Sequence, residues 1–301
     1  MSFDFITAIT SDGPEQLITG DNFVGLITVL DDFATIAGAS TESKQVKGRR
    51  NEPLTSSKYV IDVELSCRNL RFKHSSPVVA RGKMAVDTLF NLHNLLSRVI
   101  DASHLPKDQG LIISSIILAK HELKGHIAWR QLCLPLLTSL SRQSSNAARE
   151  IRHNAISHLQ RILLGPHIIV DEFHHSQVEE IFNRVVFPLV DDLLKVEVFQ
   201  RDPQGMSETR LRASALLCKA FMHLDVREDQ VKADFRILWI QILDLLDRLM
   251  NIDKGDHLVR RITASFSLLI ITSVRSCPGI AEECCSSHEC CRYSCSAFAR
   301  A

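Results

Sequence analysis

The chain has 301 residues, 45% of them hydrophobic, with 12 Gly, 9 Pro, 35 basic and 35 acidic residues. Because the charges balance, no global field draws the protein to nucleic acid or to an anionic membrane, and any such contact must be a local patch. So few turn-forming residues in so hydrophobic a chain argue against a sheet protein and favour long helices.

The sequence predicts neither a secretory signal nor a membrane span. The N-terminus lacks a basic start followed by an apolar core. The most apolar runs, residues 111–119 and 262–274, are shorter than the ~20 residues that a transmembrane helix requires. We therefore expect a cytoplasmic protein without a transmembrane helix.

Residues 1–103 are predicted to form an N-terminal helical part. A helix from Asp21 to Ala37 starts at a good N-cap residue and carries an apolar stripe at helical spacing. A second helix, from Val79 to Ala102, has a broad apolar face and stops before Pro106, which cannot extend it. Between them, residues 59–73 fit either a short helix or an extended segment.

A flexible linker with a basic bias is predicted at residues 38–58, where helical periodicity is lost. Its basic residues are candidate membrane-surface contacts, because each one near an anionic surface contributes ~1 kcal/mol to binding. The candidates are Lys44, Lys47, Arg49 and Arg50. A solvated loop is the alternative, since Glu42 and Glu52 dilute the charge and no apolar anchor accompanies the patch.

Residues 104–127 form an atypical insert that contains His121-Glu122 followed by His126. The pattern resembles the metalloprotease motif H-E-x-x-H, which places two imidazoles four residues apart on one helical face. Here the second His comes five residues after the first, about 140° away around a helix. We therefore predict a passage from helix to loop in place of a zinc site.

An internal repeat begins near Ala128, and residues 128–255 are predicted to be its core. Three helices of similar apolar sequence contain Pro135, Pro188 and Gln241, which follow one another at intervals of 53 residues. A helix of a second type follows each of the first two, which gives an A-B-A-B-A order. This order predicts an all-α fold, an armadillo/HEAT-like α-solenoid of stacked helix pairs that complete one another's core.

The two predicted B helices, Arg149–Leu164 and Glu208–Leu224, repeat a pattern of charged and small residues. The matched pairs are Glu150 and Glu208, Arg152 and Arg210, Ala155 and Ala213, Leu159 and Leu217, and Arg161 and Lys219. The charged side chains are candidates for recognising a partner or for pairing across neighbouring helices, where surface pairs contribute ~0–1 kcal/mol each. The candidate set is Arg149, Glu150, Arg152, Arg161, Glu208, Arg210 and Arg212.

The cysteines divide into two groups. Cys67, Cys133 and Cys218 are spread through the body and are predicted to be buried free thiols of a reducing compartment. The other six crowd between Cys277 and Cys295 in an atypical tail, residues 256–301. Adjacent Cys-Cys pairs are less well spaced to bind one metal ion than the cysteines of a C-x-x-C motif. We therefore predict a poorly ordered end and assign no metal or cofactor.

The repeat core resembles the C-terminal region of the large Golgi-type Arf guanine-nucleotide exchange factors, the GBF/Gea class. The segments that carry the resemblance are AWRQLCLPLL, REIRHNAISHLQRILLGP, EEIFNRVVFPLVDDLL, GMSETRLRASALLCKAF and LWIQILDLLDRLM. Upstream, DNFVGLITVLDDFATIAGA and VARGKMAVDTLFNLHNLL fit with less specificity, and the insert and the tail depart from the family pattern. The resemblance implies an armadillo-like solenoid downstream of the catalytic exchange domain.

The chain has no stretch like the exchange domain, whose FRLPGE-type loop carries the catalytic Glu, so the resemblance implies no enzyme activity and no catalytic residue here. It implies a regulatory, membrane-targeting region in Golgi vesicle-mediated transport, cytoplasmic and peripheral on Golgi membranes. The implied partners are other domains of the exchange factor, Golgi-associated proteins or the membrane surface, with Arf contacted only indirectly and no nucleic acid. The alternative is a free-standing helical-repeat adaptor that binds a protein partner through its concave face.

Overall fold

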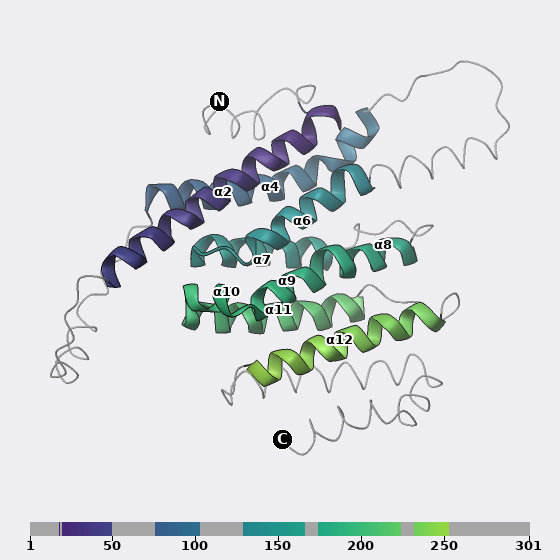
Figure 1. Cartoon of the computed structure of the whole chain (residues 1–301). Helices are drawn as coiled ribbons and strands as arrows, with labels where there is room; N and C mark the ends of the chain where they lie inside the picture. Colours follow the sequence, from purple (N-terminus) through teal and green to yellow (C-terminus); the bar gives the residue numbers. More distant parts are fainter. Residues whose placement is uncertain are drawn as a thin grey trace.

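The computed structural model describes residue 18 and residues 20–49, 76–102, 129–165, 174–223 and 232–252. Within these ranges every regular element is a helix (Figure 1). The helices are α2 (Gly20–Arg49), α4 (Pro77–Ala102), η1 (Trp129–Cys133), α6 (Leu134–Gln143), α7 (Arg149–Leu163), α8 (His174–Ile181), η3 (Phe182–Val186), α9 (Phe187–Leu194), α10 (Val196–Arg201), α11 (Pro203–His223) and α12 (Lys232–Ile252).

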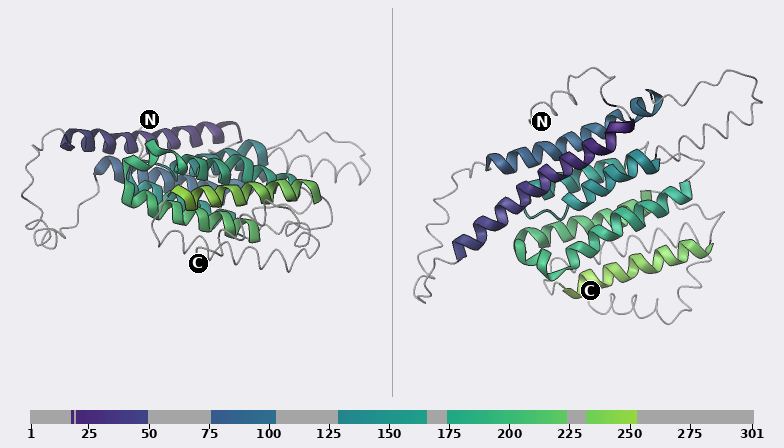
Figure 2. Two further views of the ribbon diagram at one scale, coloured as in Figure 1. Left: turned by 60° about the horizontal axis from the view of Figure 1, so that its bottom comes forward. Right: turned by 45° about the horizontal axis from the view of Figure 1, so that its top comes forward.

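The helices stack in pairs along one direction, as Figures 1 and 2 show. The first layer is α2 on α4, the second is η1 and α6 on α7, and the third is α8, η3 and α9 on α11. The last described helix, α12, packs on α9 and α11. This arrangement confirms the predicted all-α repeat of stacked helix pairs.

One continuous apolar core runs through the stack. Its fully buried residues come from every layer, among them Phe23, Leu89, Leu137, Val190 and Leu246. The small and apolar residues that match between the two B helices are buried as well: Ala155, Ala213, Leu159 and Leu217. No helix pair could bury such a face alone, so each layer is stabilised by the next.

A π-helical turn precedes each proline of the A helices. The turn η1 lies directly before the helix of Pro135, and η3 lies at the same place before Pro188. Proline has no N–H for the carbonyl four residues earlier, and its ring clashes with that carbonyl, so the regular helix cannot continue unchanged. A π-turn is one of the known local adjustments. The third A helix, α12, has Gln241 at this position and is α-helical throughout.

The structure corrects the predicted linker, because α2 continues to Arg49 and residues 38–49 are helical. Gly38 does not end the helix. It lets Asn146 approach, since a Cβ added there would lie 2.9 Å from the Asn146 Cγ. The hydroxyl of Ser40 donates to the carbonyl of Ala37 at 2.7 Å, which satisfies the polar side chain within the helix. Residues 50–58 lie outside the described residues.

The start of the second B helix is also corrected, because α11 begins at Pro203 and not at Glu208. Asp202 precedes the helix, and its Oδ1 accepts a hydrogen bond from the Gly205 N–H at 3.2 Å. Proline is well tolerated at the first helical position, where its missing N–H would have no partner in the helix. The Asp-Pro-Gln-Gly sequence is therefore a capped helix start.

The segment Asn22–Thr41 of α2 is long and apolar enough to cross a membrane, by length and composition, with a mean hydropathy of 1.4. It is the one such helix in the described part of the chain, and 39% of the segment is buried within the protein. Its buried face packs on α4 and α6 and includes Asp31, which is ion-paired with Arg142. These contacts are those of a core helix, which passes the same criteria as a span.

Candidate functional site

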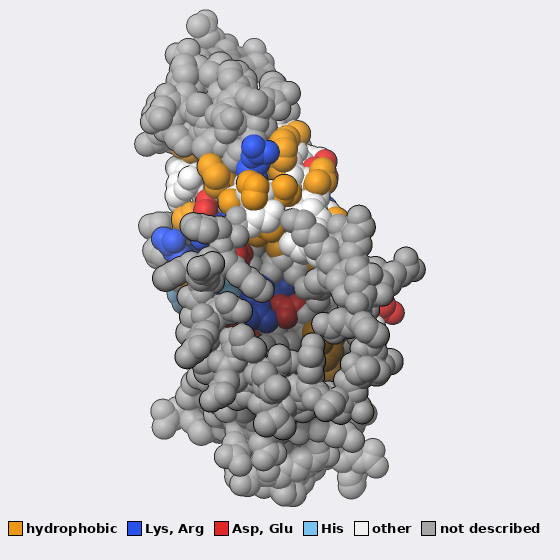
Figure 3. Space-filling view, turned by 90° about the vertical axis from the view of Figure 1, so that its left-hand side faces the viewer, with side chains coloured by type: hydrophobic (Ala, Val, Ile, Leu, Met, Phe, Trp, Pro, Cys, Tyr) orange, Lys and Arg blue, Asp and Glu red, His pale blue; other side chains and the backbone are white. Residues whose placement is uncertain are grey.

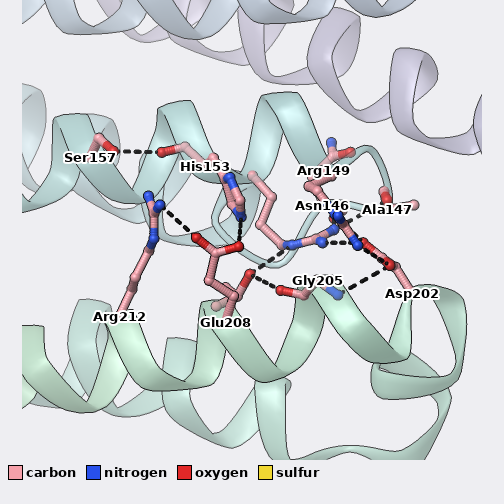
Figure 4. Close-up of polar contacts among 11 residues, drawn as sticks. Asn146, Ala147, Arg149, His153, Ser157, Asp202, Gly205, Glu208 and Arg212 are labelled. Carbon is pink, nitrogen blue, oxygen red and sulfur yellow. Dashed lines mark hydrogen bonds and ion pairs between the residues drawn. The ribbon is translucent and has the colours of Figure 1, made fainter. Parts of the chain in front are cut away.

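The junction between α7 and α11 brings together much of the predicted charged motif (Figure 4). Arg149 and Arg152 lie in the first turn of α7, and Asp202 lies immediately before α11. Glu208 and Arg212 follow on the next turns of α11. The junction therefore joins residues that are about 50 to 60 positions apart in the sequence.

Arg152 is the centre of this junction and its side chain is completely buried. Its Nη2 donates to Asp202 Oδ2 at 2.7 Å, and its Nε donates to Thr209 Oγ1 at 2.9 Å. Its Nη1 donates to the carbonyl oxygens of Asn146 at 2.7 Å and of Ala147 at 3.2 Å. Burial lowers the pKa of Arg152, but a guanidinium stays charged in proteins. Arg152 thus ties the connector before α7 to the start of α11.

Asp202 forms ion pairs with two arginines at once. Besides Arg152, its carboxylate accepts hydrogen bonds from Arg149, from Nε at 3.0 Å and from Nη2 at 2.8 Å. The hydrogen bond from Arg149 holds the pKa of Asp202 well below its ordinary value, although partial burial opposes the shift. A charge-assisted, bidentate pair of this kind is among the stronger polar contacts in proteins.

Gly205 is required by this network. A Cβ at this position would lie 2.7 Å from Arg152 Nη2 and would also meet Asp202 Oδ2 and Arg149 Nε. A side chain here would push the two arginines off the carboxylate. Gly205 is therefore needed because a side chain would not fit beside the ion pair, and not because the backbone turns at this position.

The outer part of the junction is more exposed. Glu208 Oε1 accepts from Arg212 Nη2 at 2.7 Å, and Glu208 Oε2 lies 3.6 Å from His153 Nε2. Burial lowers the pKa of His153, with a further contribution from Arg212. Glu150 is exposed to solvent. Exposed pairs such as Glu208 with Arg212 contribute at most ~1 kcal/mol.

Asp202 predicts a specific pH dependence of stability. A carboxyl whose pKa is lowered by folding stabilises the fold above the ordinary carboxyl pKa of ~3.9, and the contribution is lost as the pH falls through the folded-state value. The stability difference between the wild type and Asp202→Asn should therefore shrink as the pH is lowered from about 5 to about 2. Urea unfolding at each pH measures the difference. A difference that does not change with pH would contradict the assignment.

Arg210, the match of Arg152 in the repeat, is also buried. Its Nε donates to the carbonyl of Leu193 in the last turn of α9 at 2.8 Å. Its guanidinium lies over the ring of Phe199, 4.1 Å from the centroid. A basic side chain on the last carbonyls of a helix is favourable. Both matched arginines thus bind backbone carbonyls of an adjacent segment.

Arg161 takes part in a second contact, between α7 and α4. Its guanidinium lies 4.5 Å from the centroid of the Phe90 ring, and Phe90 stacks on His158 at 4.4 Å. His158 Nε2 lies 2.7 Å from Asp87 Oδ1, which also accepts from Asn154 at 2.6 Å. Partial burial raises the pKa of Asp87, but the hydrogen bond from His158 lowers it. The net effect is a pKa below the ordinary value. Arg161 therefore belongs to a layer contact separate from the α7–α11 junction.

A buried polar cluster between α2 and α6 was not predicted from the sequence. The carboxylate of Asp31 accepts from Ser139 at 2.7 Å, from Arg142 at 2.6 Å and from Gln143 at 2.9 Å. Beside it, Asn146 Nδ2 donates to the carbonyl of Ala34 at 3.0 Å. The signal was present in the sequence, because Asp31 is an acidic residue within the apolar stripe of its helix.

The two body cysteines that the structure describes, Cys133 and Cys218, are buried free thiols, as predicted. Burial raises the pKa of each thiol to about 12. Because the thiolate is the reactive form, neither should be alkylated by iodoacetamide at neutral pH in the folded protein. Peptide mapping by mass spectrometry before and after addition of urea tests this. Modification of either residue without denaturant would contradict it.

The structure describes only some of the remaining candidate residues. Lys44, Lys47 and Arg49 lie in the last turns of α2, and Arg50 lies outside the described residues. The insert, with His121 and His126, and the Cys-rich tail also lie outside them. Among the residues that the structure describes, no group of three or more His, Cys, Asp or Glu side chains could hold a metal ion.

Comparisons with known proteins identify the repeat. Residues 133–267 match the family described as the GBF1-like tetratrico peptide repeat region. The chain is 28% identical over 144 residues to the Golgi-specific brefeldin A-resistance guanine nucleotide exchange factor 1 homolog of Caenorhabditis elegans, which covers 48% of this chain and 7% of that protein. It is 29% identical over 125 residues to the ARF guanine-nucleotide exchange factor GNOM of Arabidopsis thaliana, covering 40% of this chain and 8% of that protein. No solved structure matches the chain.

The chain therefore matches only a small part of either relative. The family description names tetratricopeptide repeats, and the stacked helix pairs seen here are common to that class and to the armadillo-like class. The predicted resemblance is thus confirmed by the family match and by the similarity to two exchange factors. Residues 133–267 are similar to the GBF1-like repeat region, and the two relatives are guanine-nucleotide exchange factors, which supports a fragment of a Golgi-type Arf guanine-nucleotide exchange factor.

Proposed function

We propose that this chain is a non-catalytic, regulatory and membrane-targeting α-solenoid of an Arf guanine-nucleotide exchange factor that acts in Golgi vesicle-mediated transport. The observation that carries the proposal is the match of residues 133–267 to a repeat region of exchange factors. The proposed location is cytoplasmic, peripheral on Golgi membranes. The proposed partners are other domains of the exchange factor and Golgi-associated proteins or the membrane surface, with Arf contacted only indirectly.

The side-chain chemistry supports a structural role for the repeat. The charged residues of the motif, Arg152 and Arg210 above all, are used to join helices and to bind backbone carbonyls. A catalytic group needs a free position next to a substrate. At the α7–α11 junction the carboxylate of Asp202 is instead occupied by two arginines and the Gly205 N–H.

Two measurements test the proposal. The purified chain should not accelerate release of a fluorescent GDP analogue from Arf, whereas a complete exchange factor should do so in the same assay. A fluorescent fusion of the chain should colocalise with a Golgi marker in cells. Nucleotide release by the chain would overturn its non-catalytic role, and a fusion that stays diffuse in the cytosol would overturn membrane targeting.

A free-standing interaction adaptor is the second candidate. Two isoleucines on α12, Ile237 and Ile240, are 56% and 55% exposed and lie about one helical turn apart, so a partner could cover both. The transcript decides between the candidates. An exchange domain on the same transcript supports the first, and a complete transcript without one supports the adaptor.

A further inference from the structure

Each described B helix has a buried arginine that binds carbonyls at the end of the A helix before it. Arg152 of α7 donates to the carbonyls of Asn146 at 2.7 Å and of Ala147 at 3.2 Å, just after α6. Arg210 of α11 donates to the carbonyl of Leu193 at 2.8 Å, in the last turn of α9. The last carbonyls of a helix have no N–H partner within that helix, and a positive charge beside them is favourable. The arginine thus joins the end of an A helix to the B helix that follows.

The third A helix, α12, ends in the same way as α9. In Figure 1 the helices α6, α9 and α12 all end at the left-hand side of the stack, where α7 and α11 begin. Figure 3 looks onto that side and shows acidic and basic side chains next to one another in the middle of the molecule. The last turn of α9 contains no basic residue, and Arg210 supplies the charge there. The last turn of α12 contains no basic residue either.

Among the described residues, α12 does not have a B helix of its own. The helix α6 packs on α7, and α9 packs on α11, whereas the main contacts of α12 are with α9 and α11 of the preceding layer. The chain continues from position 253 to position 301. The family match extends to residue 267, past the end of α12 and past residue 256, where the predicted tail starts. The partner of α12 is therefore expected in the residues that follow it.

Residues 261–271 repeat the buried pattern of the two B helices. In both helices the arginine is followed by Ala three residues later, by Leu seven residues later and by Ile or Ala ten residues later. In α7 these residues are Arg152, Ala155, Leu159 and Ile162, and each is at most 3% exposed. In α11 they are Arg210, Ala213, Leu217 and Ala220, and each is at most 1% exposed. The same spacing gives Arg261, Ala264, Leu268 and Ile271.

The distance along the chain selects the same arginine. Arg152 follows Pro135 by 17 residues and Arg210 follows Pro188 by 22 residues. Arg261 follows Gln241, the matching position of α12, by 20 residues. The preceding residue, Arg260, does not fit the pattern, because a threonine and a serine lie three and seven residues after it.

We propose that residues 257–272 form the third B helix, which packs on α12, and that the Arg261 guanidinium binds carbonyls at the end of α12. Asp256 lies directly before this helix and is a good N-cap residue, as Asp202 lies directly before α11. In this helix Ala264 lies at the closest contact with its neighbours, and Leu268 and Ile271 enter the core. The repeat order becomes A-B-A-B-A-B, and the atypical tail starts after residue 272. This pairing does not depend on membrane targeting.

Amide hydrogen exchange of the purified chain, measured by mass spectrometry on its peptides, tests the proposal. The amides of residues 261–272 should be protected to a degree similar to those of α11. Arg261→Met should speed their exchange by about ten- to hundredfold, the effect expected for the loss of a hydrogen bond from a charged group. Arg261→Lys, which keeps the charge and a donor, should restore part of the protection.

The chain supplies matched controls. Arg210→Met removes the described contact with Leu193 and should speed exchange in α11 by a similar factor. Lys219→Met, at an exposed position of α11, should change exchange there by no more than about twofold. Arg260→Met should have a smaller effect than Arg261→Met, because adjacent residues of a helix point about 100° apart.

Three outcomes would overturn the proposal. Complete exchange of residues 261–272 while the amides of α11 stay protected would show that no third B helix is formed. Equal effects of Arg260→Met and Arg261→Met would show that Arg261 does not have the position of Arg152 and Arg210. Protection of residues 261–272 that disappears when the protein is diluted would show that a second copy of the chain covers the segment, and not α12 of the same chain.

Discussion

Asp202→Ala is expected to destabilise the repeat core by about 3–5 kcal/mol, because it leaves the buried Arg152 guanidinium without a counter-charge. Arg152 keeps neutral acceptors in Thr209 and in the carbonyls of Asn146 and Ala147, but these do not neutralise it. Urea unfolding followed by far-UV circular dichroism measures the loss as a lower midpoint at an unchanged slope.

Two companion variants make this prediction specific. Glu208→Ala, which removes the exposed carboxylate of the same junction, should cost no more than about 1 kcal/mol. Arg152→Met in the Asp202→Ala background should recover part of the lost stability, because an apolar side chain of similar length does not need a counter-charge. Equal losses for Asp202→Ala and Glu208→Ala, or no recovery in the double variant, would show that the buried pair is not the main contact of the junction.

Asp31→Ala should loosen the attachment of α2 to α6 and cost about 2–3 kcal/mol. The change removes the carboxylate that accepts from Ser139 and Gln143, which are each 1% exposed. Gln143 keeps Thr35 Oγ1 and the Asp31 carbonyl as acceptors, but a buried donor left without a partner, such as the Ser139 hydroxyl, costs about 1–3 kcal/mol. Arg142 is mostly exposed and can be solvated. The expected result is a lower unfolding midpoint together with faster amide hydrogen exchange in α2.

The neighbouring residue supplies the control. Asp32 is exposed on the same turn of α2, so Asp32→Ala should change stability by less than about 0.5 kcal/mol. If both variants exchange α2 amides at the same rate, then the polar cluster of Asp31 is not what holds this helix.

The sequence by itself determined the helical class, the alternation of two helix types and the core residues of the repeat. These features follow from side-chain spacing along a short segment, since residues at helical intervals share one face wherever the chain lies. Leu159 and Leu217 are buried as their positions in the repeat required, and Ala155 and Ala213 are likewise buried. The π-turns before Pro135 and Pro188, and their absence from α12 with Gln241 at that position, follow from the N–H that proline lacks.

Only the tertiary structure decided where α2 ends and what the charged motif contacts. A glycine often ends a helix, but Gly38 lies within α2. The close approach of Asn146, which is more than 100 residues away in the sequence, explains why a glycine is needed at this position. Arg152 and Arg161 lie on one helix, yet one binds the start of α11 and the other stacks on α4. Such pairings depend on which helices are neighbours and at what register, and local periodicity carries no information about either.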